Sequence, residues 1–246
     1  GVFAGASDLN KAGGGVMTLT GSSSGQTGAI NVNAGGLSYS GSGATTGSLD
    51  IETASGAALN SDGGTFQTGL VITNAGTTTL TGSESIAAIT GAGGVALTGG
   101  ATTLTLNGTG TNSGAISGDG SLIVAAGATT LAGTNTYTGT TTVTGGSLEL
   151  QNGAAIADTG AVVVNAGTLT VTDAETIGSL AGSGGTVQMD DNLTTGGNNT
   201  STSYGGVLPG AGTFEKPRSG TMTLTGTNTA NGTTTVSGGT LTVSGS

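Results

Sequence analysis

The carboxylates Asp50 and Glu52 stand in a stretch that alternates polar and apolar residues. Such alternation is typical of a strand with one buried face, so both carboxylates project from the opposite face, about 7 Å apart. Inverting glycosidases hold their two carboxyl groups at a similar separation. The nearest aromatic residues in the sequence, Tyr39 and Phe66, provide no evident platform for a sugar ring. Charge on a solvated strand face explains the pair better, and a polysaccharide-cleaving pair stays the alternative.

A serine motif of hydrolases occurs at Ser23, within the segment Gly21-Ser-Ser-Ser-Gly25. The pattern G-x-S-x-G forms the nucleophile elbow of many esterases. A nucleophilic serine of this type needs a histidine base, and the chain contains no histidine. We attribute the match to the abundance of serine and glycine. Arg218, the only arginine, is the one residue available as an arginine base of a lyase, and nothing around it in sequence indicates such a site.

Two acidic clusters have the residue types that bind calcium, because hard cations prefer carboxylate oxygens. They are Asp190 with Asp191, and Asp173 with Glu175. Neither cluster stands in a glycine-spaced calcium-binding loop, so solubilising charges at turns explain them better. The sequence therefore predicts no catalytic, cofactor-binding or metal-binding residues, no cofactor and no enzymatic activity.

Threonines separated by one residue are the most abundant motif. If stacked on one flat face, such pairs would order water as ice-binding solenoids do; otherwise, threonine is simply a favoured polar residue of strands. A single face that carries every pair would distinguish the two interpretations. The pairs are Thr18/Thr20, Thr77/Thr79, Thr103/Thr105, Thr140/Thr142, Thr168/Thr170, Thr223/Thr225 and Thr240/Thr242.

The elements that carry these residues are copies of one repeat. Residues 131–150 read LAGTNTYTGTTTVTGGSLEL, and residues 224–243 read LTGTNTANGTTTVSGGTLTV, with thirteen of twenty positions identical. Each copy contains two alternating stretches around a Gly-Gly pair, which predicts strand, glycine corner, strand. Weaker copies occur along the whole chain, so we predict one repeat architecture over residues 1–246.

The spacing of the corner glycines indicates the length of one coil. From each corner glycine to the next, the position in the sequence advances by 20, 20, 24, 27, 19, 21, 18, 27 and finally 27. A parallel β-helix of ten to eleven coils explains a period near twenty, and such a rod is about 50 Å long. A hairpin meander favours two-residue Asn-Gly or Asp-Gly loops, and these dipeptides do not recur regularly here. The glycines are Gly36, Gly56, Gly76, Gly100, Gly127, Gly146, Gly167, Gly185, Gly212 and Gly239.

Composition narrows the range of partners. The chain has three basic and thirteen acidic residues, for a formal net charge of −10. With no basic stripe, direct binding of nucleic acid or of an anionic membrane is excluded. No stretch approaches the length of a transmembrane helix, so we expect no direct membrane insertion. Cysteine is absent, which rules out a disulfide framework.

The order of motifs over residues 106–152 and 178–245 resembles the passenger-associated strand repeat of Gram-negative autotransporters. The resemblance rests on Asn-Asn-Thr-Ser-Thr at 198–202, on a Gly-Val-x-x-Gly-x-Gly turn at 206–212, and on the run from Lys216 to Leu241. It implies a right-handed parallel β-helix, exported through the outer membrane by a C-terminal translocator barrel. The sequence departs from the family pattern at Ala230, where tyrosine is usual and Tyr137 keeps it, and at Pro209 and Pro217, which disfavour a regular ladder.

The resemblance implies a segment at the extracellular surface of a Gram-negative bacterium. Because the repeat pattern is already under way at Gly1 and continues to Ser246, we predict a fragment of a longer passenger. Our first hypothesis is a non-catalytic structural or adhesive passenger that contacts other cell-surface or host-surface molecules. The second is a self-assembling filament or surface-layer subunit. The third is a polysaccharide-acting β-helix enzyme that uses Asp50 and Glu52.

Overall fold

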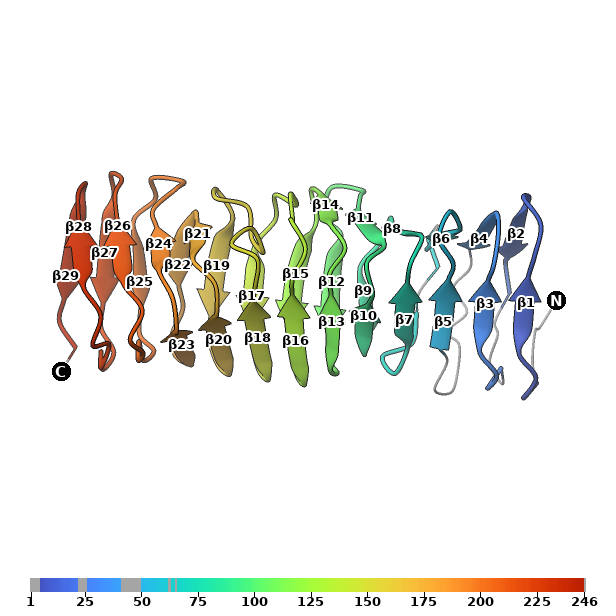
Figure 1. The fold of residues 1–246 in the computed structure, drawn as a ribbon, viewed down its shortest axis with the longest axis horizontal. Helices are drawn as coiled ribbons and strands as arrows, with labels where there is room; N and C mark the ends of the chain where they lie inside the picture. The colour runs from blue at the N-terminus through green and yellow to red at the C-terminus, as the bar shows by residue number, and fades with distance from the viewer. Residues whose placement is uncertain (1–4, 22–25, 41–49, 62, 65, 246) are drawn as a thin grey trace.

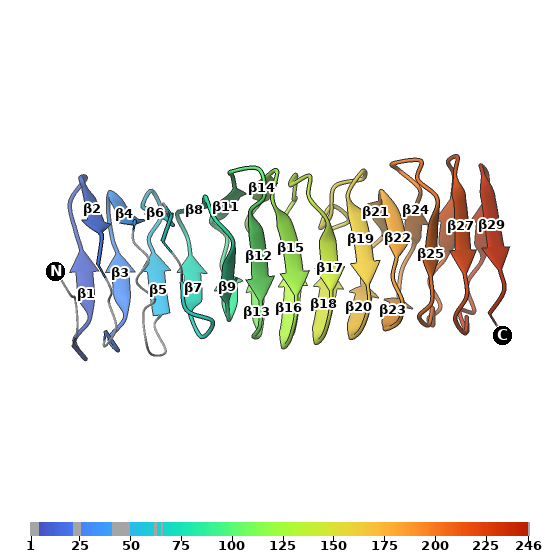
Figure 2. The ribbon, with the colours of Figure 1, turned by 180° about the vertical axis from the view of Figure 1, so that it is seen from behind.

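The chain forms a rod of stacked parallel strands (Figure 1, and from behind in Figure 2). The structure is a computed structural model that describes residues 5–21, 26–40, 50–61, 63–64 and 66–245. The rod has about eleven turns of roughly 20 residues each, and it contains no helix in its described part. Within that part, every pairing of two strands is parallel. The predicted β-solenoid is therefore confirmed, and the hairpin meander is wrong.

In the described part of the chain the coils have three sides, which the chain visits in the order side 1, side 2, side 3. Side 1 contains β1 (Leu9–Lys11), β3 (Ile30–Val32), β5 (Asp50–Thr53), β7 (Val71–Asn74), β10 (Ala88–Thr90), β13 (Gly110–Asn112), β16 (Ala128–Leu131), β18 (Ser147–Leu150), β20 (Thr168–Val171) and β23 (Thr186–Met189). Side 2 contains β2 (Val16–Leu19), β4 (Gly36–Tyr39), β6 (Ala58–Asn60), β8 (Thr77–Leu80), β11 (Gly94–Leu97), β14 (Ile116–Gly118), β21 (Glu175–Ile177), β24 (Leu193–Thr195), β26 (Phe214–Lys216) and β28 (Thr234–Val236). Side 3 contains β9 (Glu84–Ile86), β12 (Thr103–Leu106), β15 (Ser121–Val124), β17 (Thr141–Val143), β19 (Ala161–Val164), β22 (Ser179–Ala181), β25 (Thr202–Tyr204), β27 (Thr221–Leu224) and β29 (Thr240–Val243).

The ladders continue where a side lacks a strand. On side 2, segments 135–138 and 154–156 lie between β14 and β21, and Thr136 N–H donates to the Ile116 carbonyl at 2.8 Å. On side 1, residues 207–210 follow β23 through isolated parallel bridges. Pro209 stands in that segment and its carbonyl still accepts from Met189 N–H at 3.0 Å. Because proline has no N–H to donate, this segment forms isolated bridges in place of a regular strand. The stack of coils nevertheless continues through it.

The corner glycines of the sequence do not all lie at the same corner of the three-sided coil. Gly56 and Gly76 lie between sides 1 and 2, Gly100 lies between sides 2 and 3, and Gly127 lies between sides 3 and 1. Intervals near twenty connect equivalent corners, whereas the longest intervals span one coil and one further side. Gly36 is the first residue of β4, and the left-handed corner conformation is found at Gly35, with φ 69°.

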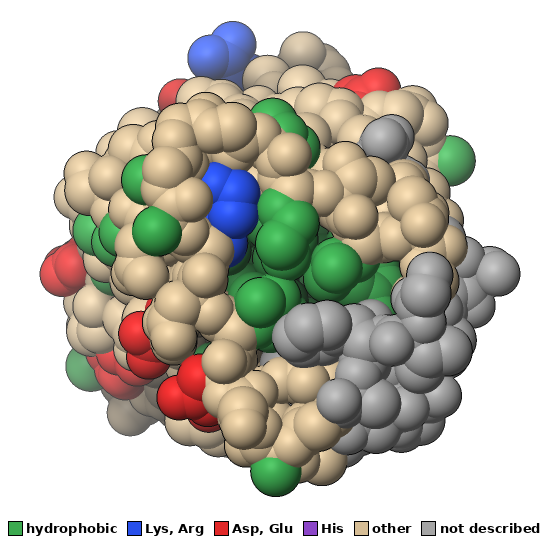
Figure 3. Space-filling model, turned by 90° about the vertical axis from the view of Figure 1, so that its right-hand side faces the viewer, with side chains coloured by type: hydrophobic (Ala, Val, Ile, Leu, Met, Phe, Trp, Pro, Cys, Tyr) green, Lys and Arg blue, Asp and Glu red, His purple; other side chains and the backbone are tan. Residues whose placement is uncertain are grey.

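Like side chains stack in columns inside the rod because each strand pairs in register with its neighbour. Leu104, Leu122, Thr141, Val162 and Leu180 form one such buried column on side 3. Figure 3, an end view, shows hydrophobic side chains in the middle of the cross-section. The core is narrow, as its short aliphatic and threonine side chains predict.

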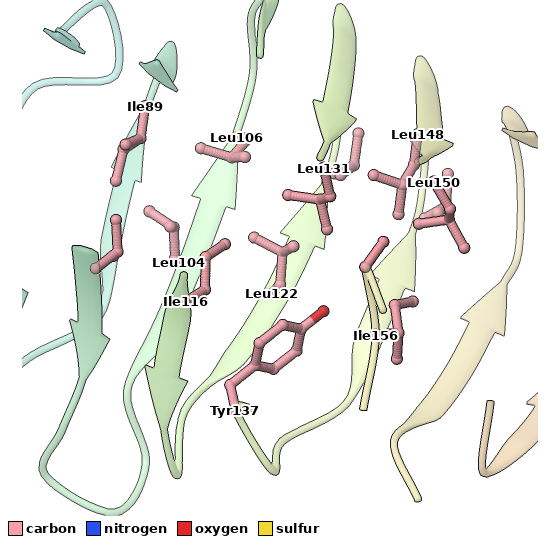
Figure 4. Close-up of a cluster of buried hydrophobic side chains, with 14 of the residues drawn as sticks. Ile89, Leu104, Leu106, Ile116, Leu122, Leu131, Tyr137, Leu148, Leu150 and Ile156 are labelled. Carbon is pink, nitrogen blue, oxygen red and sulfur yellow. The ribbon is translucent and has the colours of Figure 1, made fainter. Parts of the chain in front are cut away.

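Tyr137 is the largest buried side chain in the middle of the rod. It lies on side 2 between β16 and β17, and its ring faces Ile116, Leu122 and Ile156 (Figure 4). Its side chain is 1% exposed. The phenol lies 2.6 Å from the hydroxyl of Thr141, so the ring fills the core while its polar atom has a partner.

Candidate functional site

Two polar side chains point into the core where side 2 has no strand. The Asn135 amide accepts from Ile116 N–H at 2.7 Å and donates to the Ala155 carbonyl at 2.7 Å. The Glu175 carboxylate accepts from the N–H groups of Ala155 and Ile156 at 3.2 and 2.8 Å. These side chains satisfy backbone groups that lack a ladder partner, which would otherwise cost about 1–3 kcal/mol each.

Glu175 therefore lies elsewhere than the sequence predicts. It is 2% exposed, so its assignment with Asp173 to a solvated turn or calcium ligand is wrong. Burial raises the pKa of Glu175 to about 7, while hydrogen bonds from Ile156 and Ala155 lower it and the charge of Asp158 raises it. The net effect is a raised pKa, because the ionised carboxylate loses more stabilisation from water than the two N–H donors provide.

Glu84 is a second buried carboxylate, on side 3. It is 3% exposed and accepts from Phe66 N–H at 2.7 Å. Burial raises its pKa to about 7, against hydrogen bonds from Phe66 and Ser61 that lower it. Here too the carboxylate pairs with a segment whose described residues contain no strand. Both glutamates thus hold irregular parts of a coil to the next one.

Two lysines have the corresponding role at corners. Lys11 Nζ donates to the carbonyls of Gly13 and Ala34 at 2.7 and 2.9 Å. Lys216, which is 2% exposed, donates to the carbonyls of Arg218, Ser219 and Gly238 at 2.7, 3.3 and 3.3 Å. An ammonium has three donors and no acceptor, so each lysine binds carbonyls of its own corner and of the next coil.

Asn112 is a buried amide without such partners. It ends β13, and neither its Oδ1 nor its Nδ2 has a hydrogen bond within the described part of the chain. In the same column, Asn74 accepts from Thr53 Oγ1 at 2.6 Å and donates to the Gly94 carbonyl at 2.9 Å. The next residue of the column after Asn112 is Leu131, so an apolar side chain suits this position.

We expect Asn112→Val to stabilise the protein by about 1–2 kcal/mol, because it removes an unpaired buried amide and suits a strand. Urea unfolding measures the change. Asn135→Val is the matched control: it leaves Ile116 N–H and the Ala155 carbonyl unpaired, and should destabilise by about 2–4 kcal/mol. A loss of stability in both variants would contradict this account of Asn112.

The remaining acidic candidates lie on the surface. Asp50 and Glu52 project from the same exposed face of β5, as predicted, beside Val71 and Thr73 of β7. Asp173 accepts from Asn152 N–H at 2.8 Å. The described residues contain no group of three acidic side chains placed to hold a metal ion.

The other sequence candidates do not gather into one site. Ser23 lies outside the described residues. The threonine pairs are spread over all three sides: those beginning at Thr18 and Thr77 are on side 2, and the pair beginning at Thr168 is on side 1. The others are on side 3. An ice-binding face that carries every pair is therefore wrong. Arg218 is exposed at the corner after β26.

Comparison with known proteins identifies the repeat. The family model described as passenger-associated-transport-repeat matches residues 9–38, 126–150 and 219–243. These segments lie on the parallel solenoid described above. The chain matches an autotransporter passenger with β-strand repeats. No curated protein and no solved structure matches it.

The three matched repeats are rotated relative to one another about the rod axis. Met17 and Met222 stand at equivalent positions in the run Met-Thr-Leu-Thr-Gly, and each is preceded by a lysine six positions earlier. The equivalent strands are β2 on side 2, β16 on side 1 and β27 on side 3. The repeat therefore encodes a strand–corner unit that fits any side, and not a fixed face of the rod.

The last repeat contains a cavity where the middle repeat contains Tyr137. Ala230 and Thr234 are the counterparts of Tyr137 and Thr141 when the two strong copies are aligned. A cavity of about 110 Å³ lies beside them, lined also by Leu224, Asn228 and Leu241. The hollow is open, because Thr234 and Val243, which line it, are both exposed in the last described coil.

The family also bears on export. It implies a translocator barrel in the full-length protein and suggests secretion to the surface of Gram-negative bacteria. In the part of the chain that the structure describes, no helix has the length and apolar character needed to cross a bilayer.

Proposed function

We propose that the chain is a non-catalytic structural and adhesive segment of an extracellular passenger, which holds a contact surface away from the cell. The observation that carries this proposal is the parallel register from β1 to β29, maintained on three sides by hydrogen bonds between successive coils. Because each coil is bonded to the next, the segment is a stiff spacer whose flat sides offer long shallow surfaces.

Attachment of coated beads tests this function. Inert beads that carry the purified chain should bind to host cells or to bacteria, whereas beads with heat-unfolded chain should not. Equal attachment of folded and unfolded chain would contradict the proposal. A panel of polysaccharides should yield no product; turnover that Asp50→Asn abolishes would establish the enzyme hypothesis instead.

A second candidate function, lateral self-association, is favoured by the charge distribution on side 3. The middle outward position of each strand on this side is uncharged from β9 to β29, over about 38 Å. With a net charge of −10, two copies repel each other least when they meet through such a neutral face. These residues are Ser85, Thr105, Ile123, Thr142, Val163, Ala181, Ser203, Thr223 and Thr242.

Light scattering over a concentration series tests self-association. Ile123→Glu, in the middle of the neutral row, should reduce the association constant at least tenfold. Ser38→Glu adds the same charge on side 2, where Ser38 faces outward on β4, and should have little effect. A monomer at every concentration would overturn this candidate.

A further inference from the structure

The only arginine of the chain stands at the rim of a groove on side 2. The groove has a volume of about 450 Å³. Thr176 of β21 and Thr194 of β24 line it and are adjacent in the ladder. Asp158 lines one end and Arg218 the other, three coils further along the chain. Three coil spacings separate the backbones at these charged ends by about 14 Å.

One wall of the groove is held in place by a loop that reaches backward along the rod. Gly197 packs against the carbonyl of Asp158 so closely that a Cβ there would clash with that oxygen. Asn198 then fixes the loop, because its N–H donates to the Gly178 carbonyl at 3.2 Å and its Nδ2 donates to Ser179 Oγ at 3.0 Å. The groove is therefore bounded by ordered backbone, which favours binding without a large ordering cost.

The charged side chains at the ends are available to a ligand. Asp158 and Arg218 are both exposed, and neither side chain makes a hydrogen bond or ion pair with the residues that the structure describes. A free guanidinium presents parallel N–H donors that match the two oxygens of a carboxylate. Asp158 and the threonine hydroxyls offer acceptors and donors suited to alcohol groups.

We propose that this groove binds a carboxylated sugar, a uronic or sialic acid, with its carboxylate on Arg218 and its hydroxyl groups toward Thr176, Thr194 and Asp158. A peptide strand is a poorer fit, because β21, β24 and β26 already pair with one another and leave no free ladder edge in the floor. Nucleic acid is disfavoured by a chain of net charge −10. The inference deepens the proposed adhesive function by naming a ligand class.

Titration of the full chain with matched sugars tests the groove. Methyl glucuronide and methyl glucoside differ only in the carboxylate, and a methyl sialoside distinguishes the two sources of that group. We expect the acid sugars to bind with a Kd on the order of 1 mM or below, at least tenfold tighter than the glucoside. Equal binding of the glucoside, or binding of none of the three, would overturn the proposal.

Substitutions locate the binding to this groove. Arg218→Gln should weaken binding of the acid sugar at least tenfold. Asn10→Asp makes the same change in net charge on exposed β1, where its carboxylate can still accept from Asn31, and should leave the affinity within about twofold. Equal losses in both variants would show a general charge effect and overturn the site. The titration measures binding of a small sugar in solution, whereas the bead assay measures attachment to whole cells, so either can fail without the other.

Discussion

Tyr137→Ala should destabilise the middle of the rod by about 3–5 kcal/mol, the usual cost of removing a large buried aromatic ring. The ring is fully enclosed by side chains of three successive coils, and the narrow core has little freedom to collapse around a hole. Hydrogen exchange of the amides between β14 and β19, combined with urea unfolding, measures the effect. Because a solenoid unfolds in neighbouring units, exchange should accelerate most in these coils.

Two further variants separate the ring from its hydroxyl. Tyr137→Phe keeps the ring and loses only the contact with Thr141, so a cost of about 1 kcal/mol is expected. Ala230→Tyr introduces the ring into the cavity beside Thr234, and should raise the stability of the last coils. If Tyr137→Phe cost as much as Tyr137→Ala, packing of the ring would not be the cause.

The coil length could be predicted from the sequence because glycine corners recur where the backbone must turn. The intervals of 24 and 27 residues between corner glycines do not fit a single coil length. Gly76 to Gly100 and Gly185 to Gly212 each span one coil plus one side, a shift that only a three-sided cross-section explains. The same shift explains why the repeats are rotated about the rod axis. The copies at 131–150 and 224–243 are separated by four coils and two sides, so they begin on different sides.

Side 2 of the coil has no uniform signal in the sequence. Its residues 135–138 and 154–156 contain no strand, so the alternation of polar and apolar residues fails there. Asn135 and Glu175 replace the missing ladder bonds from inside the core. A polar residue is ordinarily assigned to the solvent face. This rule therefore places Asn135 and Glu175 on the surface, although both are buried.

A signal for the buried charges was nevertheless present. Glu84 and Glu175 each stand two positions before an isoleucine, Ile86 and Ile177, and residues two apart on a strand face the same way. Lys216 likewise stands two positions after the buried Phe214. The two-residue period of a strand therefore predicts that these charged side chains face the core, although their charge alone would predict the surface. The groove, by contrast, depends on a loop that returns to Asp158, which no periodicity indicates.

The buried glutamates should make the rod less stable as pH rises. Glu84 and Glu175 have a pKa of about 7 in the folded protein, against 4.5 for the ordinary group. Between these values the folded state holds protons that the unfolded chain has released, so stability decreases by up to about 1.4 kcal/mol per pH unit for each group. The full contribution is present below pH 4.5 and is lost above about pH 7. Urea unfolding midpoints at pH 5, 6, 7 and 8 measure this slope.

Glutamine substitutions show which glutamates cause the decrease of stability with pH. Glu84→Gln and Glu175→Gln should each remove about half of it, and the double variant should be nearly independent of pH between 5 and 7, because sites several coils apart add. Glu149 has the opposite sign: hydrogen bonds from Gln151, Thr172 and Thr130 lower its pKa against the opposing effect of burial. Its contribution is therefore lost only as pH falls below the ordinary value, and Glu149→Gln should leave the slope between pH 5 and 7 unchanged. A slope that survives in the double variant would show that other groups cause it.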